Sequence, residues 1–148
     1  MNIRELRADD YKTIYGFIIN EMEHSEVSFI DLSASLDLMK SDNSYMLFVA
    51  EDNNQVVGFV SAVKLIGCID SSYIEIGCLV VSDNYQKRGV GKLLLEYIES
   101  LGKSNGIKNY SITSGLHRKN AHKFYEHNGY EKGGYAFYKG LVILKKDE

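Results

Sequence analysis

The segment Tyr85–Lys92, Tyr-Gln-Lys-Arg-Gly-Val-Gly-Lys, constrains the fold of this chain more than any other. It follows a mostly apolar run, Tyr73–Val81, and the polar turn at residues 82–84. It leads into a segment whose apolar residues recur at helical spacing, namely Val90, Leu93, Leu94, Tyr97, Ile98 and Leu101. The pattern predicts a strand, then a basic loop that contains glycine, then the first turn of a helix.

A loop of this kind is suited to binding an anion. The first N–H groups of a helix have no intrahelical partner, and the helix dipole places partial positive charge there. Gly89 and Gly91 lack a Cβ atom, so the backbone can approach a ligand closely. Lys87, Arg88 and Lys92 add full positive charge. We therefore expect this loop to bind a phosphate group.

Two common phosphate-binding loops do not match the segment. A Walker loop requires glycine at the position of Gln86 and Ser or Thr at that of Leu93, and a dinucleotide fingerprint requires a third glycine at that of Leu94. The pattern Gln-x-x-Gly-x-Gly after a hydrophobic strand resembles instead the pyrophosphate loop of the GNAT superfamily, the acetyl-CoA-dependent N-acyltransferases. The resemblance implies that backbone N–H groups here hold the pyrophosphate of coenzyme A. The alternative is a loop that is rich in glycine only because it turns, with basic residues that face water.

The remaining patterns predict a single α/β domain over residues 1–148. Strands are expected at Asn2–Arg7, Tyr45–Glu51, Val56–Ile66, Tyr73–Val81, Asn109–Ser114, Tyr135–Lys139 and Leu141–Leu144. Helices are expected from Tyr11 to about Glu23, around Leu32–Met39 after a cap at Ser28 or Asp31, from Val90 to about Leu101, and from Asn120 to Gly129. Tight turns indicate an antiparallel meander, and the helix after the basic loop indicates a parallel strand pair. This order resembles the GNAT fold, a mixed, mostly antiparallel sheet flanked by helices, whose parallel pair splays around acyl-CoA.

A second motif begins at Asn120 and reads Asn-Ala-His-Lys-Phe-Tyr-Glu-His-Asn-Gly-Tyr. It resembles the GNAT signature Asn-x-x-Ala-x-x-Phe-Tyr-x-x-x-Gly-Phe, although Asn120 stands directly before Ala121 and Tyr130 replaces the final Phe. The resemblance implies that Tyr125 is the general acid that protonates the departing thiolate; the alternative is an aromatic residue that packs beside Phe124. Asn120 is implied to bind the pantetheine arm or the pyrophosphate, or it is only a helix cap.

The reaction that the resemblance implies needs a neutral amine. For an amine like that of lysine, a pKa of about 10.4 leaves roughly one molecule in 2,500 neutral at pH 7, which costs about 4.6 kcal/mol. Glu75 is the candidate base, because a charged residue between Ile74 and Ile76 is out of pattern and the family often takes its base from this strand. A glutamate needs an environment that strengthens it as a base, or a water relay, to act on an ammonium group. The alternative is that Glu75 lies on a solvated face of the strand.

The implied co-substrate is acetyl-CoA. The backbone of Leu79–Val81 is expected to pair with the pantetheine arm like an added strand, and an N–H group there would polarise the thioester. The expected cofactor-binding residues are Leu79, Val80, Val81, Gln86, Lys87, Arg88, Gly89, Val90, Gly91, Lys92 and Asn120. No metal is expected, because Cys68, Cys78 and the four histidines show no spacing typical of metal ligands.

Composition narrows the class of protein. A formal charge of −3, with 45% hydrophobic and 25% charged residues, indicates a globular protein and argues against nucleic acid as a partner. With no apolar run of about 20 residues and no signal core, the chain is expected to be cytoplasmic and not to bind membranes.

The expected activity is direct transfer of an acetyl group to a primary amine of a small molecule or peptide, since no nucleophile is placed for a covalent intermediate. The alternatives are a non-catalytic module that binds acyl-CoA, and a binder of another phosphate ligand outside the family. The acceptor is expected near residues 21–29 and 135–138, and a homodimer is the assembly that we consider.

Overall fold

The computed structural model describes residues 1–140, which form one five-stranded sheet with helices on both faces. The elements are β1 (Asn2–Glu5), the short 3-10 turn η1 (Ala8–Asp10), α1 (Tyr11–Asn20), α2 (Phe29–Lys40), β2 (Tyr45–Asp52), β3 (Gln55–Ile66), β4 (Ser72–Val81), the short 3-10 turn η2 (Asp83–Tyr85), α3 (Val90–Ser104), β5 (Tyr110–Ile112) and α4 (Lys119–His127). The strand order is β1-β2-β3-β4-β5, antiparallel throughout except for the parallel pair β4 and β5. The predicted mixed α/β sheet with one parallel pair is confirmed.

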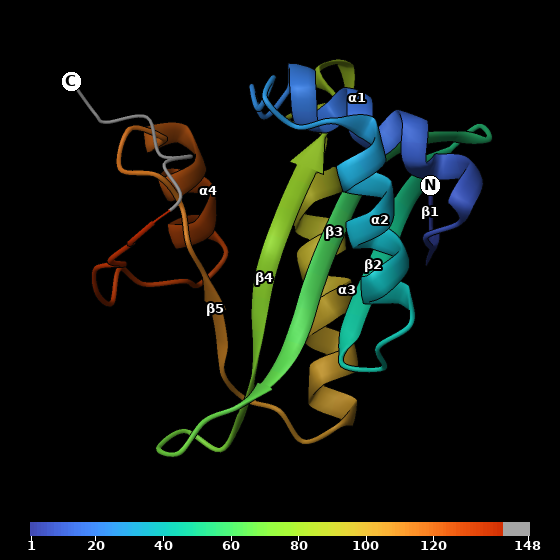
Figure 1. Cartoon of the computed structure of the whole chain (residues 1–148). Helices are drawn as coiled ribbons and strands as arrows, with labels where there is room; N and C mark the ends of the chain where they lie inside the picture. Colours follow the sequence, from blue (N-terminus) through green and yellow to red (C-terminus); the bar gives the residue numbers. More distant parts are fainter. Residues whose placement is uncertain (141–148) are drawn as a thin grey trace.

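Two hydrophobic cores lie on opposite faces of the sheet, with α3 on one face and α1 and α2 on the other (Figure 1). The core beneath α3 contains Phe48, Ala50, Val57, Val60, Ala62, Ile74, Ile76, Val90, Leu94, Leu95, Ile98 and Ile107. The core beneath α1 and α2 contains Leu6, Tyr11, Ile14, Phe17, Leu36, Leu47, Val49, Phe59 and Val80. Successive side chains of a strand point to opposite faces, so the central strands supply apolar residues to both cores.

The side chain of Ser28 caps α2, as predicted, whereas no side chain caps α1. Ser28 is the N-cap of α2, and its hydroxyl accepts a hydrogen bond from the backbone N–H of Asp31. The carboxylate of Asp10, the N-cap residue of α1, accepts hydrogen bonds from the backbone N–H of Arg7 and from the guanidinium of Arg4. It therefore joins β1 to the start of α1.

A β-bulge at Gly77 reverses the alternation of side chains along β4 between the two cores. Ser61 of β3 pairs with Cys78 and the next residue, Ala62, pairs with Ile76, so Gly77 is the extra residue. Before the bulge, Ile76 is buried in the core beneath α3; after it, Cys78 packs against the core beneath α1 and α2. Without the bulge, these two residues would lie on one face.

The expected strand at Tyr135–Lys139 is wrong, because these residues form no helix or strand. The side chains of Tyr135 and Phe137 are 84% and 93% exposed, and an alternating aromatic pattern forms a strand only where a neighbouring strand pairs with it. The expected strand at Leu141–Leu144 lies outside the described residues. The first strand and the first helix also end earlier than predicted, at Glu5 and Asn20. Within residues 1–140, no helix is long and apolar enough to cross a membrane.

Candidate active site

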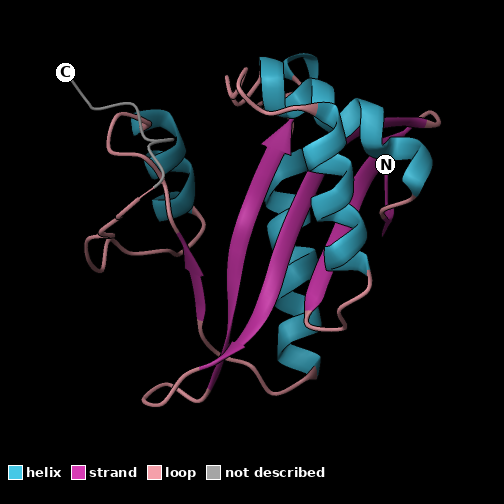
Figure 2. Ribbon diagram, viewed as in Figure 1, coloured by secondary structure: helices cyan, strands magenta, loops and turns pink. Residues whose placement is uncertain are grey.

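The parallel pair of strands separates where β4 runs on past β5. The two strands pair only from Ile74 with Tyr110 to Ile76 with Ile112. Beyond that point β4 continues to Val81, while the chain after β5 turns away toward α4 (Figure 2). Residues 77–81 therefore have no β5 partner on this edge, and the edge includes the predicted Leu79, Val80 and Val81. Free backbone groups at a strand edge are a template for an extended ligand.

The basic loop is held at the end of this open edge. The side-chain amide of Gln86 donates to the carbonyl oxygen of Val81 at 3.1 Å and to Oδ1 of Asp83 at 3.0 Å. Val90, only 1% exposed, anchors the other end of the loop in the core. The loop therefore starts α3 directly beside the last residues of β4.

The N-terminus of α3 has the geometry of an anion site. Gly89 is its N-cap residue, with φ of 84°, and no side chain caps the helix. A Cβ atom built at Gly89 would have no heavy atom within 4 Å. The first hydrogen bond of the helix runs from the N–H of Leu93 to the carbonyl oxygen of Gly89, which leaves the N–H groups of Val90, Gly91 and Lys92 without an intrahelical acceptor.

The three basic side chains of the loop are exposed, and two of them make local contacts. The guanidinium of Arg88 lies 5.1 Å from the centre of the Tyr85 ring, and the ammonium of Lys92 pairs with Glu96 at 3.7 Å. Lys87 adopts a positive φ of 61°. Each side chain adds positive charge near the start of α3.

Helix α4 brings Tyr125 to the same region. Phe124 of this helix packs against Gly91, since a Cβ atom there would lie 3.1 Å from Cζ of the ring. Tyr125 is half-buried beside Phe124, with ring centres 5.4 Å apart. Burial raises the pKa of the Tyr125 phenol, the positive charge of Arg118 lowers it, and Cys78 raises it further. The phenol therefore carries its proton at neutral pH and lies within electrostatic reach of β4.

Comparison with known proteins identifies the family. The model of the acetyltransferase (GNAT) family matches residues 2–130. This chain belongs to the GNAT acetyltransferase family. It is 30% identical to an uncharacterized N-acetyltransferase, YhdJ, of Bacillus subtilis over 105 residues, which cover 70% of this chain and 74% of that protein.

One further relative and one solved structure are similar to nearly the whole chain. The aminoalkylphosphonate N-acetyltransferase of Salmonella typhimurium is 27% identical over 144 residues, covering 94% of this chain and 90% of that protein. The crystal structure of an aminoglycoside acetyltransferase from an uncultured soil metagenomic sample superposes with a TM-score of 0.81 at 23% identity, covering 95% of each chain. At this identity the structural match shows that the two share a fold.

Several of the residues predicted for the site lie close together in the structure. Leu79–Val81, the loop 86–92 and Tyr125 lie around the open end of β4, as described above. Asn120 is exposed in the first turn of α4, and it is not the cap, because the N-cap residue is Arg118. Residues 117–121 line a shallow pocket of about 290 Å³ there.

Glu75 lies before the bulge. It is half-buried, opposite Val63 of β3 and Ser111 of β5, and its neighbours Ile74 and Ile76 point to the core beneath α3. Strand alternation therefore directs Glu75 to the same face as α1 and α2, the face to which the bulge also turns Cys78.

Sequence reasoning missed how Cys78 is placed. Its thiol donates a hydrogen bond to Sδ of Met22, which follows the end of α1, over 3.5 Å. Burial raises the pKa of this thiol to about 12, although Arg118 lowers it. A thiol with such a pKa is not a nucleophile at neutral pH. The glycine before Cys78 was the available signal, since a glycine within a strand often marks a bulge.

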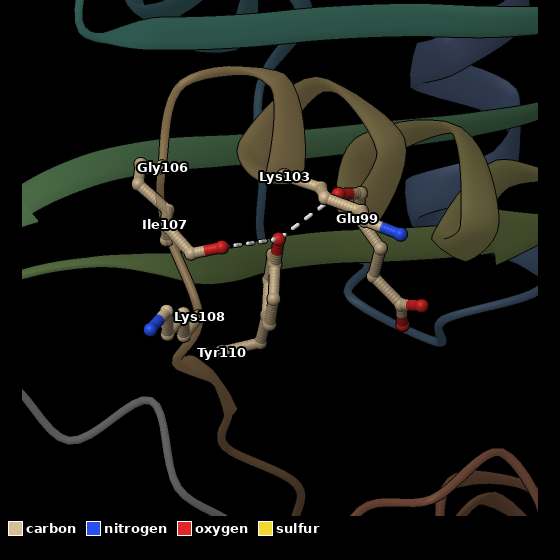
Figure 3. A pocket seen from close by; sticks show the side chains of 6 residues that line it. All are labelled: Glu99, Lys103, Gly106, Ile107, Lys108 and Tyr110. Atoms are coloured by element: carbon tan, nitrogen blue, oxygen red, sulfur yellow. Dashed lines mark hydrogen bonds between the residues drawn. The ribbon is translucent and has the colours of Figure 1, made fainter.

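Another pocket, of about 430 Å³, lies at the opposite end of α3 and contains no predicted site residue. It is lined by Glu99, Lys103, Gly106, Ile107, Lys108 and Tyr110 (Figure 3). The Tyr110 hydroxyl lies between the carbonyl oxygens of Glu99 and Ile107, at 2.9 and 3.3 Å. These contacts tie β5 to the end of α3. Within residues 1–140, no three His, Cys, Asp or Glu side chains gather as a metal site would require.

Proposed function

We propose that this protein transfers an acetyl group from acetyl-CoA to a primary amine of a small molecule or peptide by direct attack. The observation that carries the proposal is the open edge of β4 at residues 77–81, which ends at the uncapped N-terminus of α3. An extended pantetheine arm and a pyrophosphate need these two features side by side.

The residues fit acetyl-CoA at both ends of that path. Gly89 offers open space and backbone N–H groups for the pyrophosphate, and Lys87 and Arg88 supply charge. The edge of Leu79–Val81 offers backbone donors and acceptors for the amides of the arm. Asn120, exposed at the start of α4, is a further contact for the arm or the pyrophosphate.

The chemistry requires removal of a proton from the amine, attack on the carbonyl carbon and protonation of the leaving sulfur. Tyr125 is the proposed acid, because burial raises the pKa of its phenol, which therefore carries a proton at neutral pH, and because Phe124 beside it packs against Gly91 at the start of α3. Glu75 is the proposed base, on the face of the sheet that carries α1 and α2. An N–H group of the open β4 edge would polarise the thioester carbonyl.

The acceptor is proposed to be a small amine, with aminoalkylphosphonates as the first compounds to test because of the similarity to the Salmonella typhimurium enzyme. The acceptor would enter between the end of α1 and the β-bulge of β4 at Gly77.

Calorimetric titration with acetyl-CoA, CoA and ATP tests the donor. We expect micromolar binding of acetyl-CoA and much weaker binding of ATP. Thiol release with a panel of amines then tests turnover. Binding of acetyl-CoA without release for any amine would favour a non-catalytic acyl-CoA-binding module, and preference for ATP would overturn the proposal.

A further inference from the structure

Basic residues line the pocket at the start of α4. The pocket has a volume of about 290 Å³. It is lined by His117, Arg118, Lys119, Asn120 and Ala121, and none of these five residues is acidic. The chain as a whole carries a formal charge of −3, so this positive surface is a local feature. Positive charge around a hollow in the surface favours an anionic ligand.

Arg118 has the unused hydrogen-bond donors that an anion requires. The residue is exposed, and although it is the N-cap residue of α4, its side chain makes no capping hydrogen bond. Among residues 1–140, no carboxylate forms an ion pair with its guanidinium. An arginine presents several N–H groups in a planar fork that matches the oxygens of a carboxylate or phosphate group. A phosphonate group presents the same kind of oxygens.

Arg118 and Tyr125 lie on one face of α4. They are seven residues apart in the sequence, which corresponds to two helical turns and about 10 Å along the axis. The side chains of a helix lean toward its N-terminus, so the Tyr125 ring leans toward Arg118. Burial raises the pKa of the Tyr125 phenol, and the positive charge of Arg118 lowers it. The guanidinium therefore lies on the side of α4 that carries the proposed acid.

The charge of Arg118 also acts on β4. Burial raises the pKa of the Cys78 thiol, and Arg118 lowers it. Electrostatic effects fall with distance, so the guanidinium lies near this part of the strand. Cys78 follows the last pair between β4 and β5, and its thiol contacts Met22 just after α1. Arg118 is thus near the end of α1, where the acceptor is proposed to enter.

The phosphate groups of the donor are proposed to bind elsewhere. The pyrophosphate of CoA would meet the N-terminus of α3 at Gly89, and the 3′-phosphate lies farther still from the sulfur along the same molecule. Arg118 acts instead on Tyr125, which is proposed to protonate that sulfur. An anion that reaches Arg118 therefore belongs to the acceptor.

We propose that Arg118 binds an anionic group of the acceptor, and that the acceptors are small amines that also carry a phosphonate, phosphate or carboxylate group. This inference rests on the proposed acetyltransferase function and narrows its substrate class. The guanidinium donates two hydrogen bonds to the oxygens of the anion, while the amine of the same molecule faces the thioester near Tyr125. Lys119 adds positive charge at the pocket. Amines with further positive charges, such as polyamines, are disfavoured, because Arg118 repels them.

The test uses three amines that differ only in the group at the far end. 2-Aminoethylphosphonate, β-alanine and propylamine carry a phosphonate, a carboxylate and a methyl group at the same position. KM and kcat for each amine are measured in wild type, Arg118→Gln, Arg118→Lys and Lys123→Gln. The lysine variant keeps the charge but loses the planar fork. Lys123→Gln is the control, because Lys123 is an exposed cation on the same helix and lies outside the pocket.

We expect wild type to prefer the two anionic amines. Arg118→Gln should raise their KM by about 10- to 100-fold, as loss of a hydrogen-bonded charged contact does, and should leave kcat and the constants for propylamine nearly unchanged. Arg118→Lys should retain part of the preference, and Lys123→Gln should behave like wild type. Calorimetric titration of 2-aminoethylphosphonate into protein saturated with CoA should show the same loss in Arg118→Gln, and this measurement needs no turnover.

Other outcomes overturn the proposal in distinguishable ways. Equal losses for all three amines in Arg118→Gln would show that Arg118 supports the fold or the chemistry rather than an anion. If Arg118→Gln weakens binding of acetyl-CoA but not of 3′-dephospho-acetyl-CoA, the anion belongs to the donor. A wild type that acetylates propylamine as well as the anionic amines would refute the inference and leave the proposed function standing. Turnover of no amine would refute the proposed function, and calorimetry would still decide whether Arg118 binds the anion.

Discussion

The ring of Phe124 in α4 lies directly against Gly91 in the first turn of α3, where a Cβ atom would be 3.1 Å from Cζ of the ring. This contact joins the two sequence motifs of the chain. It places α4, and with it Tyr125, beside the N-terminus of α3. The relative positions of the proposed acid and the proposed anion site thus depend on one close approach between two helices.

Gly91→Val should lower both stability and affinity for acetyl-CoA. A side chain larger than a methyl group must displace the Phe124 ring, and overpacking of this kind costs about 1 to 3 kcal/mol. Urea unfolding and calorimetry measure the two effects. Gly16→Val is the matched control, because Gly16 also lies in a helix and a Cβ atom there meets nothing within 4 Å. Equal losses in both variants would show that the contact with Phe124 is unimportant.

Gly89→Glu should abolish binding of acetyl-CoA. A carboxylate would enter the space above the free N–H groups of α3 and repel the pyrophosphate. Gly89→Gln has the same size and the same strain at a φ of 84° but no charge. We expect its affinity to fall far less, by about tenfold. Calorimetry compares the pair, and unchanged affinity in Gly89→Glu would refute the assignment of the loop.

Tyr125→Phe should lower kcat by about 10²-fold with little change in affinity for acetyl-CoA. Tyr130→Phe is the control, because this half-buried tyrosine lies 6.1 Å from Tyr125, ring centre to ring centre, and its hydroxyl donates to Glu99 instead. A buried phenol keeps its proton to higher pH, so kcat should show no loss on the alkaline side until the pH exceeds the ordinary tyrosine pKa of about 10. Steady-state kinetics measure kcat. Equal kcat values in Tyr125→Phe and Tyr130→Phe would show that Tyr125 is only a packing residue.

Cys78 should react slowly with thiol reagents although it lies at the site. Its pKa of about 12 leaves roughly 10³-fold less thiolate at pH 8 than an ordinary cysteine has. The exposed Cys68 should account for the fast reaction with Ellman's reagent. Cys68→Ser should therefore leave no fast thiol, and Cys78→Ser should retain turnover. Inactivity of a folded Cys78→Ser would instead favour a covalent acetyl-thiol intermediate.

Asp10 should contribute stability that depends on pH. Burial raises the pKa of Asp10, but the hydrogen bonds from Arg4 and Arg7 outweigh it, so the net pKa is lowered. A carboxylate whose pKa falls on folding stabilises above its unfolded pKa of about 3.9, and this contribution is lost as pH falls through the lower folded value.

Asp10→Asn should therefore cost about 3 kcal/mol at pH 7, and the difference from wild type should shrink below about pH 4. Urea unfolding from pH 7 to pH 3 measures it, with the exposed Asp9→Asn as control. A difference that stays constant over this range would refute the electrostatic origin.

The misplaced strand shows a limit of pattern reasoning. Tyr135–Lys139 has the aromatic alternation of a strand, but a strand forms only against a partner, and nothing within five residues of sequence specifies that partner. By contrast, the apolar stripe of α3 predicted a buried helix face, because a helix makes its hydrogen bonds within itself.

The sequence by itself determined the order of the elements from β1 to α4, the basic glycine-containing loop at Gln86–Lys92 and the motif that contains Tyr125, because each depends on residues close together in the chain. Only the tertiary structure decided the register of the bulge at Gly77 and the separation of β4 from β5. Each of these depends on register between distant segments, namely Ser61 against Cys78 and Ile76 against Ile112. Local patterns cannot specify such relationships, because they arise only when the chain closes around its two cores.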